Sequence, residues 1–85
     1  MKLFIVFDAS ASGYEVGGEA ANLGSISGVK SVTTLEAVAG EVPRYCLQFK
    51  IEDENAQATG AKIKEAMGQY SSYMTNVAWG AYKKI

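Results

Sequence analysis

The sequence has no histidine, one cysteine and one proline among its 85 residues. Histidine is the side chain that most often transfers protons at neutral pH and a common ligand of transition metals. Proton transfer and transition-metal binding would therefore both have to use other residues in this chain. The single cysteine, Cys46, excludes a disulfide within the chain. Domains of this length have marginal cores and are commonly stabilised by disulfides, metals or oligomerisation. Oligomerisation is therefore the source of extra stability that we expect.

The sequence also has no marked excess of positive or negative charge and no long apolar run. The formal net charge is −1, and only Lys62/Lys64 and Lys83/Lys84 are clustered, which is not the basic stripe of a nucleic-acid binder. The apolar run Leu3–Phe7 is too short to span a bilayer and does not have the form of a secretory signal. A lone unpaired cysteine fits a reducing compartment. We expect a cytoplasmic protein with no nucleic-acid partner and no membrane partner.

The pattern of residues predicts one domain over residues 1–85. Branched and aromatic residues favour a strand at 2–9, and a strict period of two favours another at 45–52. The full predicted order is strand 2–9, helix 14–23, strand 29–39, strand 45–52, a helix capped at Asp53 or Asn55 and ending near 69, and strand 73–85. In one sheet this βαββαβ order is the α+β, ferredoxin-like arrangement. It is a four-stranded antiparallel sheet with both helices on one face and the first and third strands in the middle.

The first strand has apolar side chains on both of its faces. Leu3, Ile5 and Phe7 alternate with Phe4, Val6 and Asp8. A sheet with one solvated face should alternate apolar and polar residues, and the two helices can cover only one face. Phe4 and Val6 therefore need a second cover, since an exposed apolar patch marks an interaction site.

The third strand adds polar groups to the same uncovered face. Cys46, Gln48 and Lys50 alternate with the row that runs from Tyr45 to Ile51 and packs on the helices. Apolar walls with a few placed polar groups are typical of a small-ligand cavity. The same surface also suits a self-complementary dimer interface, and both uses are compatible.

Two stretches carry a resemblance to a known family. They are 26–32 (ISGVKSV), with a glycine–valine step into the second strand, and 43–53 (PRYCLQFKIED), with a Pro-Arg-Tyr entry into the third. With 79–82 (WGAY), they resemble the dimeric α/β-barrel superfamily, most of all its EthD-like and RedY-like branches. The resemblance implies two half-barrels that close face to face around a ligand cavity, and cofactor-free enzymes of natural-product metabolism are among the members. The chain lacks the histidine of many members, which excludes a histidine-based mechanism.

Five polar or aromatic residues are candidates for ligand chemistry. In an apolar cavity the pKa of Asp8 would rise and its carboxyl would act as a general acid or base, whereas in a solvated loop it would cap Ser10 or Gly13. Gln48 would hold a ligand carbonyl or bond across a dimer. Arg44 would clamp a carboxylate or lie on the surface. Trp79 and Tyr82 face opposite sides, so only one lines the cavity, and we select Tyr82 beside the apolar walls Phe4 and Val6.

Other chemistry-bearing residues are weaker candidates. Cys46 has no histidine to lower its pKa and is interpreted as a small buried filler. The loop 10–13, followed by Gly17 and Gly18, lacks the lysine and the Ser/Thr of a phosphate-binding loop. The consecutive acids 52–54 cannot all be aimed at one metal ion. No cofactor and no metal are expected.

The leading hypothesis is a homodimeric α/β barrel that binds a small, mostly apolar molecule. A cofactor-free enzyme of natural-product or aromatic metabolism is one form of it, with Asp8 as the acid–base group and Gln48 as an orienting donor. Two alternatives stay open: a non-catalytic regulatory module of the ACT-like kind, which pairs sheets edge to edge, and a structural partner in a larger assembly. No motif in the sequence assigns a reaction.

Overall fold

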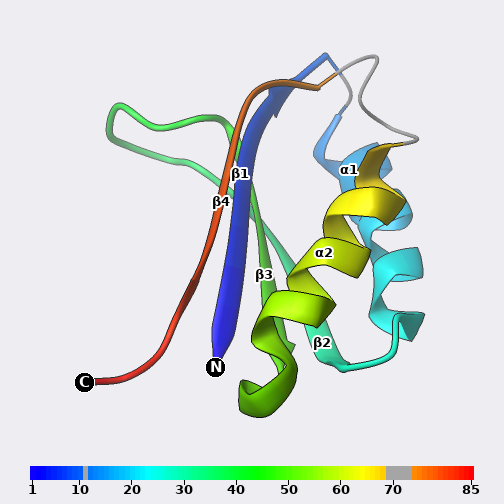
Figure 1. The fold of residues 1–85 in the computed structure, drawn as a ribbon. Coiled ribbons are helices and arrows are strands. Elements are labelled where there is room, and N and C mark those ends of the chain that lie inside the picture. The colour runs from blue at the N-terminus through cyan, green and yellow to red at the C-terminus, as the bar shows by residue number, and fades with distance from the viewer. Residues whose placement is uncertain (11, 69–73) are drawn as a thin grey trace.

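The chain forms a four-stranded antiparallel sheet with two helices on one of its faces (Figure 1). The computed structural model describes residues 1–10, 12–68 and 74–85. Its elements are β1 (Lys2–Ala9), α1 (Gly13–Ala21), the 3-10 turn η1 (Asn22–Ser25), β2 (Val29–Glu36), β3 (Tyr45–Ile51), the 3-10 turn η2 (Asp53–Asn55), α2 (Ala56–Met67) and β4 (Met74–Tyr82). The strand order is β2-β3-β1-β4. This arrangement confirms the α+β class and is compatible with a ferredoxin-like fold.

β3 ends one residue earlier than predicted, at Ile51, and β2 and β4 are shorter by about three residues each because strand length depends on a pairing partner. β2 ends at Glu36, which pairs with Tyr45 at the start of β3. Residues 37–44 then form the connection, although the sequence predicts strand as far as 39. β4 ends at Tyr82, which pairs with Lys2 at the start of β1, so residues 83–85 have no strand residue beside them. Residue 73, the predicted start of that strand, lies outside the described residues.

The core lies between the sheet and the helices and uses the predicted rows. Three residues of β1 are each paired with a buried residue of β3: Leu3 with Phe49, Ile5 with Leu47 and Phe7 with Tyr45. The other layer contributes the buried residues Val16 and Ala20 of α1, Leu23 of η1, and Ile63 and Met67 of α2. The period-two and helical patterns in the sequence therefore identified the covered face of the sheet correctly.

A capping box begins α1 and offsets the two glycines inside the helix. The Ser12 hydroxyl accepts a hydrogen bond from the Glu15 backbone N–H at 3.2 Å, and the Glu15 carboxylate accepts one from the Ser12 N–H at 3.0 Å. Such caps stabilise a helix by about 1 kcal/mol. Because the cap fixes where the helix begins, it directs Val16 and Ala20 into the core.

Helix α2 approaches the sheet closely at Gly60. A Cβ at this position would lie 3.0 Å from Cζ3 of Trp79 and 3.1 Å from Cδ1 of Leu3. The ammonium group of Lys64 lies 5.9 Å from the centre of the Trp79 ring, on the same side. Trp79 therefore belongs to the helix side of the sheet. This leaves Tyr82, as predicted, for the opposite face.

Candidate functional site

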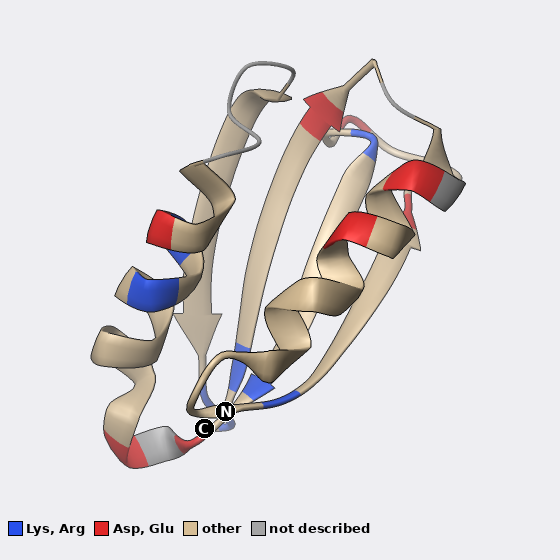
Figure 2. Cartoon of the chain, turned by 90° about the vertical axis from the view of Figure 1, so that its right-hand side faces the viewer, with Lys and Arg blue, Asp and Glu red and all other residues tan. Residues whose placement is uncertain are grey.

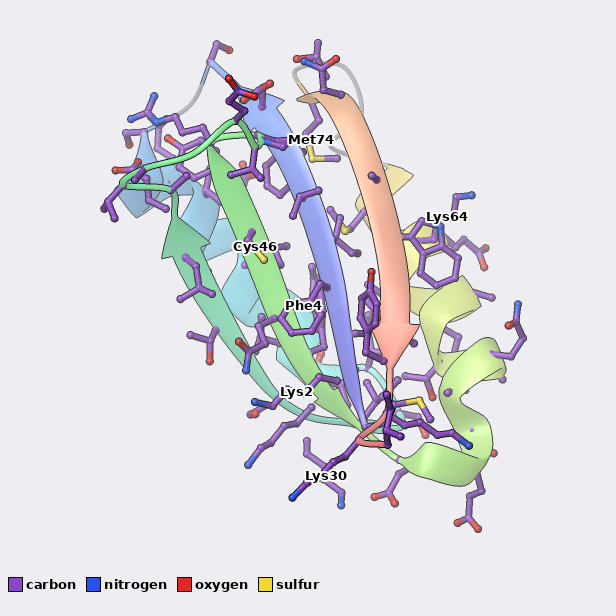
Figure 3. All side chains as sticks on the ribbon, turned by 90° about the vertical axis from the view of Figure 1, so that its left-hand side faces the viewer. Lys2, Phe4, Lys30, Cys46, Lys64 and Met74 are labelled. Atoms are coloured by element: carbon purple, nitrogen blue, oxygen red, sulfur yellow. The ribbon has the colours of Figure 1, made fainter. Side chains whose placement is uncertain are left out.

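The face of the sheet opposite the helices is apolar along its middle (Figure 3). Phe4 and Val6 of β1 are only half-buried, although they lie on a central strand. Among the described residues, no helix or loop covers them. We call this surface the open face; its apolar members are Phe4, Val6, Leu35, Cys46, Ala78, Gly80 and Tyr82.

The strand register places the predicted wall residues side by side. Phe4 pairs with Gln48 on β3 and with Gly80 on β4, and Val6 pairs with Cys46 and Ala78 in the same way. The structure thus brings Phe4, Val6 and Gln48 together at the centre of the open face. Their roles toward a ligand stay predictions.

An aromatic pair joins β1 to the edge strand β4. The rings of Phe4 and Tyr82 meet edge to face, with 5.8 Å between centroids and 63° between planes. The Tyr82 ring lies back over Gly80, where a Cβ would stand 3.6 Å from ring atoms. Tyr82 is nevertheless 66% exposed, so much of its ring is free for a further contact.

Asp8 lies near the C-terminal end of β1, where its side chain links β1 to two other segments of the chain. Its carboxylate accepts a hydrogen bond from the Arg44 backbone N–H at 2.8 Å and another from the Asn76 side-chain amide at 2.9 Å. The bond from Asn76, and then that from Arg44, lowers the pKa of Asp8 below 3.8. An acid–base group in an apolar cavity was expected to have a raised pKa. In the single chain the pKa of Asp8 is shifted in the opposite direction.

The register of β4 explains why Asn76 can reach Asp8. The pairing between β1 and β4 shifts between Val6 and Asp8, where β4 contains one extra residue. Asn76 has a φ of 55° at this bulge, a left-handed conformation that asparagine tolerates better than most residues. The bulge therefore turns its side chain toward the carboxylate.

Arg44 directs its guanidinium away from the open face. Nε lies 3.1 Å from Oε2 of Glu36, and the guanidinium lies 4.9 Å from the centre of the Tyr45 ring. Tyr45 belongs to the buried row on the helix side. The Arg44 guanidinium thus pairs with Glu36 of the same chain, and its role toward a ligand carboxylate stays a prediction. The Arg44 backbone meets another candidate, Asp8.

Cys46 is a half-buried thiol in the middle of the open face. Burial raises its pKa, which keeps the thiol protonated at neutral pH. The sequence was interpreted as giving a small buried filler here: the direction of the pKa shift agrees with an unreactive thiol, but in the single chain Cys46 is only half-buried. The neighbouring Gln48 is half-buried between Phe4 and Thr33.

Sequence reasoning missed an apolar cleft on the helix side of the sheet. The cleft holds about 200 Å³ between α2 and β4 and is lined by Ile5, Lys64, Met67, Gly68, Met74, Val77 and Trp79. The close approach at Gly60 was visible in the sequence only as a glycine on the buried stripe of the helix. Lys64 is the one charged group among these lining residues, and we assign the cleft no role.

Other site classes find no support in the part of the chain that the structure describes. Within residues 1–10, 12–68 and 74–85, no three acidic or cysteine side chains gather as a metal site. The Glu15 carboxylate occupies the Ser12 N–H at the start of α1, which opposes phosphate binding there. In the same ranges, every helix is too short or too polar to span a membrane.

Comparison with known proteins gives no assignment: no protein-family profile matches the chain, and no curated protein sequence matches it. The resemblance to the EthD-like and RedY-like branches therefore stays a prediction.

Proposed function

We propose that the chain forms a homodimer in which the open faces of two copies meet and enclose a small, mostly apolar molecule. The observation that carries the proposal is the position of Phe4 and Val6. They lie on a central strand, flanked by Gln48 and Cys46 on one side and by Gly80 and Ala78 on the other. Burying this apolar surface would contribute about 25 cal/mol per Å². A domain this small gains much of its stability from such a contact.

Face-to-face pairing accounts for these residues better than edge-to-edge pairing does. The sheet edges are β2 and β4, whereas Phe4 and Val6 lie on β1. An ACT-like dimer joined at an edge would leave both side chains in water. A second copy laid over the open face covers them, and the half-buried Gln48 then faces the space between the two sheets.

Ligand binding is the primary activity in this proposal, and catalysis is a narrower form of it. The lowered pKa of Asp8 makes its carboxylate a weak base in the single chain. Asp8 would act as an acid–base group only if the second copy desolvated it and raised that pKa. Gln48 would orient a carbonyl of the ligand, and no cofactor takes part.

Native mass spectrometry tests the proposal with a matched pair of variants. Val6→Lys places a charge at the centre of the open face, whereas Ala61→Lys places one on α2, where Ala61 is exposed on the other side of the sheet (Figure 1). We expect a dimer that retains a small molecule for the wild type and Ala61→Lys, and an empty monomer for Val6→Lys. A monomeric wild type, or a Val6→Lys variant that stays dimeric, would overturn the proposal.

A further inference from the structure

We propose that the molecule bound at the open face is an amphipathic anion, with its acid group at Lys2 and Lys50 and its apolar body over Phe4 and Tyr82. This rests on the proposed function and names the chemical class of its ligand. Five of the eight basic residues lie at this end of the sheet (Figure 3): Lys2, Lys30, Lys50, Lys83 and Lys84. Figure 2 shows several basic residues, in blue, gathered at the end of the sheet where both termini lie.

Lys2 and Lys50 are directly opposed on the two central strands. Both are exposed and share the open face with Phe4 and Gln48. Like charges placed opposite each other in a sheet are destabilising. Nearby Lys30 forms an ion pair with Glu52 at 3.7 Å, whereas among the described residues neither Lys2 nor Lys50 has an acidic partner. An anion between the two ammonium groups would relieve their repulsion.

A hollow beside this pair combines cations with aromatic surface. It holds about 440 Å³ and is lined by Met1, Lys2, Phe4, Tyr82, Lys83 and Lys84. This size is within the range of small-molecule sites, which pair apolar walls with a few charged or polar groups. The edge-to-face contact of Phe4 and Tyr82 forms the apolar wall, and the lysines supply hydrogen-bond donors for a carboxylate. Because the whole chain carries a net charge of −1, this local positive charge is not a consequence of a basic composition.

Asp8 fixes the direction in which such a ligand lies. Its carboxylate is six residues along β1 from Lys2, a distance of about 20 Å in an extended strand. The negative charge at that end repels an acid group, and the lysines attract it. The acid group therefore lies at the lysine end, and the body of the ligand extends toward Val6.

Titration with cinnamate and its neutral isostere cinnamamide tests the charge requirement. The proteins are the wild type, Lys2→Gln/Lys50→Gln and a control, Lys62→Gln/Lys64→Gln, which removes the same charge from α2 on the other side of the sheet. We expect the wild type and the control to bind cinnamate about tenfold more tightly than cinnamamide. Lys2→Gln/Lys50→Gln should lose this preference and keep its affinity for cinnamamide.

The oligomeric mass of the same samples separates this proposal from the dimer. Equal affinities for the two probes, no binding of cinnamate, or a preference that survives Lys2→Gln/Lys50→Gln would overturn the anion site, and a dimeric mass would leave the dimer standing. A monomer with a lysine-dependent preference would support the anion site and overturn the dimer. If Lys2→Gln/Lys50→Gln alone becomes monomeric, the lysines belong to the subunit contact, and the anion site is wrong.

Discussion

Asp8 shows how one carboxylate connects three strands. Its two hydrogen bonds reach Arg44, just before β3, and Asn76, within β4, while Asp8 itself belongs to β1. Both bonds favour the ionised carboxylate, which is why the pKa of Asp8 is lowered. Asp8, which the sequence suggested as a catalytic candidate, therefore contributes to the fold of the single chain.

Replacement of Asp8 should therefore have a pH-dependent effect on stability. Because the folded pKa is below the unfolded value of 3.8, the charge stabilises the fold above that value, and this contribution is lost as the pH falls through the folded pKa. We expect Asp8→Asn to have a lower urea midpoint than the wild type at about pH 7, with a smaller difference at about pH 3. A difference that grows on acidification would contradict this role.

Gly28 is required by both its backbone conformation and its neighbour. Its φ is 94°, and a Cβ at this position would collide with Oγ1 of Thr59 in α2. Gly40 has a φ of 102° with no atom within 4 Å of the same position, which makes it a matched control. We expect Gly40→Ala to cost about 1–2 kcal/mol and Gly28→Ala about 2–4 kcal/mol in chemical denaturation. Equal costs would show that Thr59 moves aside freely.

At the scale of elements, α1 is the helix whose own sequence supports it least. Gly17 and Gly18 lie inside it, and neither has an atom within 4 Å of an added Cβ. Neither glycine is therefore required by close packing. The helix depends on the capping box at Ser12 and on the burial of Val16 and Ala20.

Substitution within α1 should change stability in a direction set by helix propensity. Gly18 is exposed, so Gly18→Ala should raise the free energy of unfolding by about 0.5–1 kcal/mol. Ser12→Ala removes the cap and should lower it by about 1 kcal/mol. Urea denaturation measures both. A destabilising Gly18→Ala would mean that this face of α1 contacts something beyond the single chain.

At the scale of the whole molecule, the most important feature is the open face. Its two central strands place Phe4, Val6 and Cys46 on a surface with no covering element among the described residues. If a second copy covers this face, the folding of each chain and its association with the other copy become coupled in one equilibrium. The thermal midpoint of a protein stabilised by dimerisation rises with protein concentration.

The wild type should accordingly show a concentration-dependent thermal midpoint. We expect the midpoint to rise over about a hundredfold range of concentration, whereas Val6→Lys should have a lower midpoint that does not change. Ala61→Lys should behave as the wild type, because Ala61 is exposed on α2, on the opposite side of the sheet from the open face. Calorimetry at several concentrations measures these shifts. A constant wild-type midpoint would argue against the dimer.

The sequence by itself determined the order and type of the elements and the two faces of the sheet. These are local properties: successive side chains in a strand point to opposite faces, so Leu3 and Phe4 were assigned to different faces without knowledge of any contact. The same alternation placed Phe4, Val6 and Gln48 on one surface and separated Tyr82 from Trp79. The dimer and the ligand remain predictions.

Only the tertiary structure decided the strand ends and the partners of the polar groups. β2 and β4 end where β3 and β1 offer no further pairing residue, and no local pattern contains that information. Asp8 bonds to Arg44 and Asn76, which are 36 and 68 residues away in the sequence. The opposition of Lys2 and Lys50 likewise depends on strand register. Contacts between distant residues exist only after the chain has folded, and they set both the pKa of Asp8 and the charge of the open face.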